Sequence, residues 1–141
     1  MQLEVQARPD MDIEDDIRAS LRSFSPLKAA QHFFKVQSTN GKVRVSGNIG
    51  SPQAKRVLLN YITKISGVST IDMSDLYDDE YLRLIIGGMA HEGLLINVLF
   101  GRVLLDSTLP DGNQETLRRV RSMAGIRNVV MRYQGIEINI N

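Results

Sequence analysis

The predicted secondary structure of this chain occurs twice in the same order. Each copy has a helix, two strands joined by a tight turn, a second helix and a closing strand. Gly41 in the first turn matches Gly101 in the second at a shift of 60 residues, and Gly67 matches Gly125 at a shift of 58. A repeated order of elements indicates repeated structural units. We therefore predict an α+β protein built from two αββαβ repeats.

The clearest local prediction is a β-hairpin around Asn40-Gly41. Alternating apolar side chains precede this pair from Phe34 to Ser38 and follow it from Val43 to Ile49. A type I′ turn needs positive φ at both central residues, which Asn and Gly adopt readily. Phe100-Gly101 occupies the matching position in the second repeat and predicts a second hairpin there.

A cluster of carboxylates begins each repeat. In the first repeat, apolar side chains at helical spacing follow the carboxylates and predict a helix from about residue 12 to 24. Leu27 to Gln31, after Pro26, form either a loop or one further helical turn. The helix dipole stabilises negative charge near a helix start, so we interpret both clusters as helix starts rather than cation sites. The clusters are Asp10, Asp12, Glu14, Asp15 and Asp16, and Asp75, Asp78, Asp79 and Glu80.

The second helix of the first repeat has clear start and stop signals. Ser51-Pro52 places an N-cap serine before a proline at the first helical position, where the missing N–H costs nothing. Gly67 is predicted to end this helix as a left-handed C′ residue. A closing strand is predicted from Val68 to Met73.

The second helix of the second repeat has similar signals. Asp111 and Gln114 have capping-box spacing, and Gly125 is predicted to end the helix. A closing strand is expected from Ile126 to Met131. The expected inner face of the helix consists of Leu117, Val120 and Ala124.

These elements give the expected organisation of the chain. Residues 1–9 form an N-terminal strand, 10–73 the first repeat, 74–133 the second repeat, and 134–141 a C-terminal strand or tail. The tail could pair with the N-terminal strand, complete an edge of the second sheet, or pair with a partner. A repeat of about 60 residues is too short for a large core of its own, so we expect the repeats to pack together.

Composition excludes several classes of function. The 17 Lys and Arg against 16 Asp and Glu give a net charge of +1, too small for a nucleic-acid partner to be predicted. The absence of Cys excludes disulfides, thiolate nucleophiles and Cys-ligated zinc. His32 and His91 lack the neighbours of a zinc motif, and no serine-hydrolase or phosphate-binding motif is present. We predict no enzyme activity, no cofactor and no metal.

Basic side chains are concentrated late in the chain. Between residues 113 and 132, five arginines face only Glu115: Arg118, Arg119, Arg121, Arg127 and Arg132. Arginine binds phosphate through two parallel hydrogen bonds and is attracted to anionic lipid surfaces. Arg118, Arg119, Arg121 and Arg127 are therefore candidate lipid- or anion-binding residues, with Lys55, Arg56 and Lys64 as a weaker set. The alternative interpretation is a solvated face that pairs with the acidic helix starts.

Residues 34–47, Phe-Lys-Val-Gln-Ser-Thr-Asn-Gly-Lys-Val-Arg-Val-Ser-Gly, resemble the strand-turn-strand segment of the BON domain. Ile65-Ser66-Gly67-Val68 is similar to the helix-to-strand step of that family. The second copy departs from the pattern at Phe100, where Asn is usual, and at Ser107, where Gly is usual. The resemblance implies tandem αββαβ units in bacterial envelope proteins that associate with phospholipid or envelope components. Other members of the family have potassium-sensing or ring-building roles.

Three functions follow as hypotheses. The first is a non-enzymatic envelope module that contacts anionic phospholipid, or an envelope protein, through the basic helix of the second repeat. The second is a structural assembly module that forms homo-oligomers or pairs with a protein partner through its edge strands. The third is a potassium or small-ion sensor. The resemblance predicts the bacterial envelope or periplasm, whereas a complete chain without a leader predicts the cytoplasm.

Overall fold

The computed structural model describes residues 8–90, 92–110 and 114–138. The first repeat contains α1 Asp10–Ser20, the 3-10 helix η1 Leu21–Ser23, α2 Ser25–Ala30, β1 Phe34–Thr39, β2 Lys42–Ile49, α3 Pro52–Thr63 and β3 Thr70–Asp78. The second contains α4 Asp79–Met89, β4 Leu95–Leu99, β5 Arg102–Ser107, α5 Gln114–Arg121, β6 Asn128–Tyr133 and β7 Ile136–Glu137. The predicted α+β class is confirmed.

Each repeat has one mixed sheet. In the first, β1 pairs antiparallel with β2, and β2 pairs parallel with β3. The second sheet repeats this arrangement in β4, β5 and β6 and adds β7 antiparallel to β6. β1 and β4 are therefore edge strands at corresponding positions. Alternate apolar residues of the strands pack with the helices into a separate core in each repeat.

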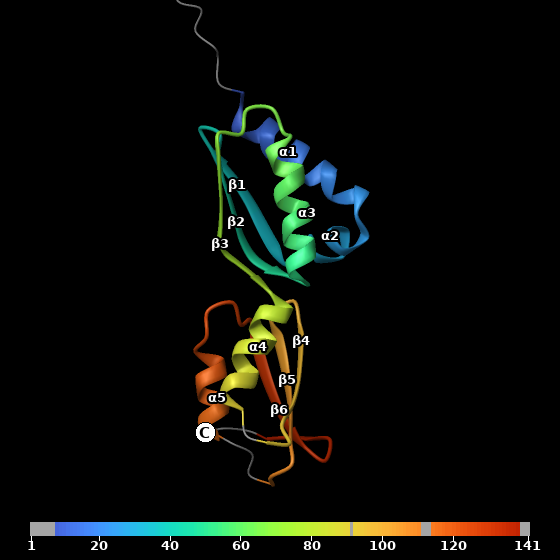
Figure 1. The fold of residues 1–141 in the computed structure, drawn as a ribbon, viewed down its shortest axis with the longest axis vertical. Helices are drawn as coiled ribbons and strands as arrows, with labels where there is room; N and C mark the ends of the chain where they lie inside the picture. Colours follow the sequence, from blue (N-terminus) through green and yellow to red (C-terminus); the bar gives the residue numbers. More distant parts are fainter. Residues whose placement is uncertain (1–7, 91, 111–113, 139–141) are drawn as a thin grey trace, which may run out of the picture.

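The two repeats stack end to end along the long axis of the molecule (Figure 1). β3 ends at Asp78 and α4 begins at Asp79, so no linker separates the repeats. The closing strand of the first repeat is thus longer than the predicted 68–73, and Asp75 lies within it rather than before a helix. Its length follows from pairing along β2 as far as Asp78 opposite Ile49. The expected boundary between residues 73 and 74 falls inside this strand.

The single helix predicted from about 12 to 24 is divided in the structure. α1 begins at Asp10 and passes into η1, which ends at Ser23. Phe24 has an extended backbone (φ −139°, ψ 115°) and so separates η1 from α2. Pro26 lies in the first turn of α2, where a helix tolerates it. Of the two alternatives for Leu27 to Gln31, the helical one is observed as far as Ala30.

The prediction that Gly67 and Gly125 are C′ residues is wrong. α3 ends at Thr63 and α5 at Arg121, each well before its glycine. Gly67 (φ +93°) and Gly125 (φ +89°) instead shape the turns that lead into β3 and β6. Each helix therefore stops early and leaves several residues for the approach to the closing strand.

Of the two helix starts predicted for α3 and α5, only the first can be compared with the structure. The Ser51 N-cap is confirmed, because its Oγ accepts a hydrogen bond from the Ala54 N–H at 3.1 Å. The capping box at Asp111 lies outside the described residues. Ala124 is exposed beyond the end of α5, so only the other two residues of the expected inner face are buried.

The N-terminal strand predicted over residues 1–9 falls largely outside the described part of the chain, and its last two residues, Arg8 and Pro9, belong to no helix or strand. The tail is described as far as Ile138. Ile136–Glu137 pairs antiparallel with β6, and the Ile138 N–H donates to the Met131 carbonyl at 2.7 Å. Among the three alternatives for the tail, completion of an edge of the second sheet is observed.

Candidate functional site

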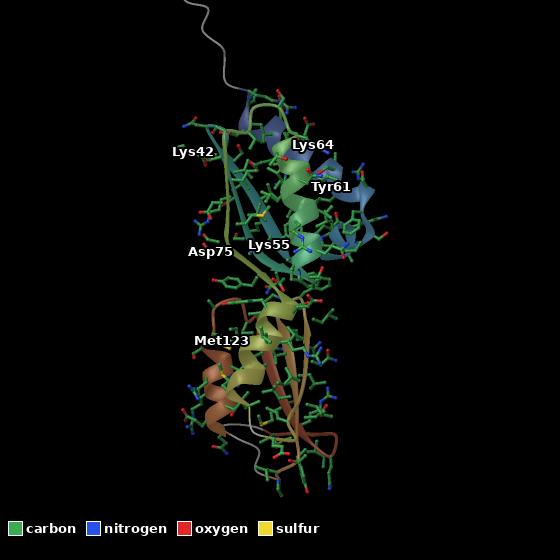
Figure 2. All side chains as sticks on the ribbon, viewed as in Figure 1. Lys42, Lys55, Tyr61, Lys64, Asp75 and Met123 are labelled. Atoms are coloured by element: carbon green, nitrogen blue, oxygen red, sulfur yellow. The ribbon has the colours of Figure 1, made fainter. Side chains whose placement is uncertain are left out.

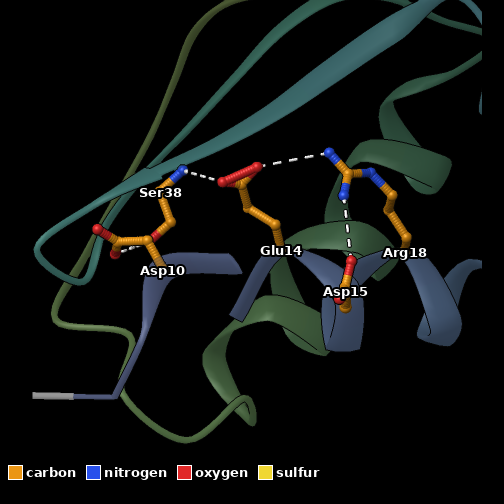
Figure 3. Close-up of polar contacts among 5 residues, drawn as sticks. All are labelled: Asp10, Glu14, Asp15, Arg18 and Ser38. Atoms are coloured by element: carbon orange, nitrogen blue, oxygen red, sulfur yellow. Dashed lines mark hydrogen bonds and ion pairs between the residues drawn. The ribbon is translucent and has the colours of Figure 1, made fainter. Parts of the chain in front are cut away.

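The first residue of α1 holds the turn of the first hairpin. The Asp10 carboxylate accepts hydrogen bonds from the Ser38 hydroxyl (2.6 Å) and from the N–H groups of Asn40 (2.8 Å) and Gly41 (3.1 Å). Figure 3 shows Asp10 beside Ser38 at the end of β1. The acidic residue thus has a long-range role in addition to its place at a helix start.

Asp79, the first residue of α4, has the same role in the second repeat. Its carboxylate accepts hydrogen bonds from the N–H groups of Phe100 (2.7 Å) and Gly101 (3.0 Å). The preceding residue, Asp78, caps α4 by accepting from the Tyr81 N–H at 2.8 Å. Two consecutive aspartates therefore serve the helix start and the hairpin turn separately.

The two turn-holding carboxyls have opposite pKa shifts. The hydrogen bonds from Ser38 and from the turn amides lower the pKa of Asp10. Burial raises the pKa of Asp79, and the hydrogen bonds from Phe100 and Gly101 offset only part of this effect. The difference in burial follows from where the two helices begin: α4 starts at the contact between the repeats, whereas α1 starts at the far end of the first repeat (Figure 1).

Phe100 connects the second hairpin to the first repeat. It has φ +47°, a left-handed conformation that costs a bulky residue about 1–2 kcal/mol. Its ring stacks on Phe33 with a centroid distance of 4.6 Å, and its side chain packs against the core of the first repeat. The Arg127 guanidinium lies 4.6 Å from the Phe33 ring centroid, and its Nε donates to the Phe100 carbonyl at 2.6 Å. These contacts hold the strained turn.

Asn48 adds a polar contact between the repeats. Its buried Nδ2 donates to the Gly125 carbonyl at 2.6 Å. A Cβ on Gly101 would lie 2.4 Å from the same Nδ2, and a Cβ on Gly125 would lie 2.5 Å from Cγ of Tyr77. We call Phe33, Asn48, Phe100, Gly101, Gly125 and Arg127 the junction. Its close packing fixes the repeats relative to one another.

The four arginines predicted to bind anions do not form one cluster. Arg118, Arg119 and Arg121 are all exposed on α5, and Arg118 pairs with Glu115 at 3.5 Å. Arg127 lies in the junction, where its guanidinium contacts the Phe33 ring and the Phe100 carbonyl. The helix therefore presents three of the four predicted side chains to solvent.

The weaker basic set lies on α3 and at its C-cap. Figure 2 labels Lys55 and Lys64 toward opposite ends of this helix. The Lys55 Nζ donates to the Leu76 carbonyl at 2.9 Å and so connects α3 to β3. Arg56 and Lys64 are exposed but lie about two helical turns apart. These residues do not converge on one site.

Exposed apolar side chains gather on α4 and β4. Among the described residues, nine large hydrophobic side chains are exposed, and five belong to these two elements. Leu84 is 75% exposed and Leu95 69%. A groove of about 780 Å³ between α4 and β4 is lined by both leucines and by two glycines of α4. We call this region the α4–β4 surface. It comprises Tyr81, Leu84, Ile85, Gly87 and Gly88 of α4 together with Leu95 and Leu99, which lie on the outer face of β4, opposite the core face of Ile96 and Val98.

The described part of the chain offers neither a metal cluster nor a membrane span. There, no group of three or more His, Cys, Asp or Glu side chains is placed to hold a metal ion. No helix in the same residues has the length and apolar character needed to cross a membrane. His32 is exposed, and His91 lies outside the described residues.

The fold and these surfaces define a two-repeat α+β protein with a rigid junction and an apolar face on its second repeat. It is similar in fold to a solved structure described as "CdsD - The structural protein of the Type III secretion system of Chlamydia trachomatis: C-terminal domain". The TM-score is 0.67 at 15% identity, over 94% of this chain and 68% of that one. At this identity the likeness shows the fold alone. A second CdsD structure aligns with a TM-score of 0.34 at 12% identity, over 86% of this chain and 91% of that one, too low a score to define a shared fold.

The predicted resemblance to the BON domain is wrong. No family model matches the chain, and no curated protein matches it in sequence. A solved structure that shares the fold over 94% of this chain is described as a structural protein of a type III secretion system. The residues behind the prediction, the Asn-Gly turn and the glycines after the second helix, are requirements of αββαβ geometry and do not distinguish families with this geometry.

Proposed function

We propose that the chain is a non-enzymatic structural module that assembles with copies of itself through its second repeat. The observation that carries this proposal is the α4–β4 surface. Leu84, Leu95 and Leu99 are each more than three fifths exposed. An exposed apolar patch of this kind on a folded protein marks an interaction site.

The similarity in fold to CdsD supports the same proposal. That protein is described as a structural protein of a type III secretion system. The rigid junction also suits a structural role, because two repeats held in one orientation present their surfaces at a fixed spacing. Partners of the assembled chain would then be further copies or other structural components of such an apparatus.

Light scattering over a range of protein concentrations tests the proposal. The intact chain, of 15.8 kDa, is expected to increase in mass with concentration. Leu84→Asp, which places a charge on the α4–β4 surface, is expected to weaken this increase. Leu109→Asp is the matched control, because Leu109 is also exposed but lies outside this surface. A constant monomer mass for the intact chain at all concentrations contradicts the proposal.

Contact with an anionic surface is a second candidate function. It is favoured by the three exposed arginines of α5, of which only Arg118 has an ion pair with a described residue. Each basic residue near an anionic leaflet contributes about 1 kcal/mol. Co-sedimentation with vesicles of anionic and of neutral lipid tests it, with Arg118→Ala/Arg119→Ala/Arg121→Ala as the variant. Equal pelleting of the variant and the wild type contradicts this function.

A further inference from the structure

The first repeat supplies an internal reference for the α4–β4 surface, because the same fold positions occur there. A shift of 60 residues relates β1 to β4, so Lys35 corresponds to Leu95 and Thr39 to Leu99. A shift of 69 relates α1 to α4, so Asp15 corresponds to Leu84. Polar side chains therefore satisfy the fold at these positions. The leucines of the second repeat need an explanation beyond stability of the fold.

The edge of the first sheet is closed by its own helix. The Ser38 N–H points away from β2 and donates to Glu14 Oε2 at 3.5 Å, and Arg18 holds the Glu14 carboxylate at 3.5 Å (Figure 3). Lys35 adds a charge of the kind that keeps edge strands from pairing. In the first repeat, edge-to-edge pairing is therefore blocked.

The edge of the second sheet lacks these devices. Val98 corresponds to Ser38, and the residue that corresponds to Glu14 is Arg83, which carries no acceptor. The position of Arg18 is occupied by Gly87. Among the described residues, no backbone hydrogen bond is formed on the outer side of β4. This edge strand is open for pairing.

The sequence of β4 is complementary to itself. Leu95-Ile96-Asn97-Val98-Leu99 is apolar on both sides of a central Asn97 and has nearly the same order in either direction. In an antiparallel pair centred on Asn97, Leu95 lies opposite Leu99 of the other strand, and Ile96 lies opposite Val98. Each leucine on the open face of the sheet then meets a leucine.

The backbone has the alternation that this pairing needs. The two-residue turn makes Leu99 and Arg102 a hydrogen-bonded pair, so the N–H and C=O groups of Ile96 and Val98 point away from β5. These are the groups that face each other in a pair centred on Asn97. The two Asn97 residues then form a non-hydrogen-bonded pair, in which side chains approach most closely.

We propose that β4 pairs antiparallel with β4 of a second copy of this chain, about a two-fold axis at Asn97. The two four-stranded sheets become one sheet of eight strands, and the α4 helices lie on the same side of the join. Leu84 of each copy then enters the groove beside Gly87 and Gly88, at which an added Cβ would meet no atom within 4 Å. Glu80 and Arg83 leave this groove without net charge. The inference rests on the proposed function and names its partner and its geometry.

Cysteine cross-linking tests this geometry in the intact chain, which contains no other cysteine. In Asn97→Cys, the two introduced thiols face each other across the axis at a Cα separation suited to a disulfide. The matched control is Gln37→Cys at the corresponding position of β1. Because pairing holds the thiols of Asn97→Cys at a high effective concentration, this variant is expected to form covalent dimer at least about tenfold faster under mild oxidation. Equal rates for the two variants overturn the inference.

A second change, made in the Asn97→Cys background, tests whether the cross-link depends on the side chains of β4 rather than on another surface. Leu95→Lys/Leu99→Thr introduces the residues of the first repeat, which that fold position tolerates, and is expected to abolish the fast cross-link. Leu59→Lys, an exposed leucine on α3, is expected to retain it. If light scattering shows that the chain associates but the Asn97→Cys variant does not cross-link, the proposed self-assembly holds and the proposed pairing of β4 is wrong. If the chain stays monomeric, both the proposed self-assembly and the proposed pairing of β4 are wrong.

Discussion

The stacked Phe33 and Phe100 rings couple the two repeats, and a double-mutant cycle measures that coupling. Phe33→Ala, Phe100→Ala and the double variant are compared with the wild type by urea unfolding. The ring centroids are 4.6 Å apart with an interplanar angle of 13°. Such a pair contributes about 0.5–1.5 kcal/mol beyond the area that it buries. We therefore expect a coupling free energy of about 1 kcal/mol.

The two single variants should differ. Phe33→Ala removes the stack and also the contact with Arg127, which is worth about 0.5–1 kcal/mol at an exposed site. Phe100→Ala removes the stack and the packing of its ring on the core of the first repeat, and it keeps the cost of positive φ, because alanine is also disfavoured in this conformation. Each should lower the free energy of unfolding by about 1–3 kcal/mol, through different additional contacts.

A second cycle controls for changes in the denatured state. Ile136 on β7 is 72% exposed and belongs to the other sheet, so Ile136→Ala and Phe33→Ala should add within about 0.5 kcal/mol. If the effects of Phe33→Ala and Phe100→Ala on the free energy of unfolding add within the same margin, the stacked rings do not couple the repeats.

Two further predictions concern the second hairpin turn. Because the pKa of Asp79 is raised in the fold, its ionisation costs stability as the pH rises above the ordinary value of 3.8, and Asp79→Asn removes this contribution. The stability advantage of the wild type over Asp79→Asn in urea unfolding should therefore shrink with rising pH, and a pH-independent difference contradicts this. Gly101→Ala places a Cβ 2.4 Å from Asn48 Nδ2 and should lower the free energy of unfolding by about 2–4 kcal/mol. Gly135→Ala has a similar φ in open space and should cost about 1 kcal/mol in the same assay; equal losses contradict the clash.

The repeats and hairpins could be predicted because their signals are local. Asn40-Gly41 specifies a type I′ turn by the positive φ of two adjacent residues, and both are observed in that region. Ser51-Pro52 similarly specifies a helix start within three residues. The ends of the helices were less predictable, because a positive-φ glycine suits a loop before a strand as well as a C′ position. Gly67 and Gly125 show this ambiguity.

The junction could not be predicted, because it depends on how the repeats are placed. Asn48 occupies a strand, and its buried amide acquires a partner only when Gly125 lies beside it. Phe100 departs from the expected asparagine for a reason that is visible only beside Phe33. Arg127 was grouped by charge with the arginines of α5, whereas the fold places it against these rings.

The α4–β4 surface has a signal in the sequence, but the alternation used to predict the strand does not reveal it. Leu94, Ile96 and Val98 mark the inner face of a strand, but Leu95 and Leu99 make the outer face apolar as well. Comparison with Lys35 and Thr39 at the same fold positions identifies the difference. An internal repeat thus provides a reference that a single strand does not.

Pairing of two copies through β4 would protect specific backbone amides, and amide hydrogen exchange measured by NMR tests this residue by residue. The outward N–H groups of Ile96 and Val98 should exchange more slowly as the protein concentration rises, because they become hydrogen-bonded to the second copy. The N–H of Val36, at the corresponding position of β1, should exchange at the same rate throughout. Exchange at Ile96 and Val98 that does not change with concentration, or that changes no more than at Val36, contradicts pairing through β4.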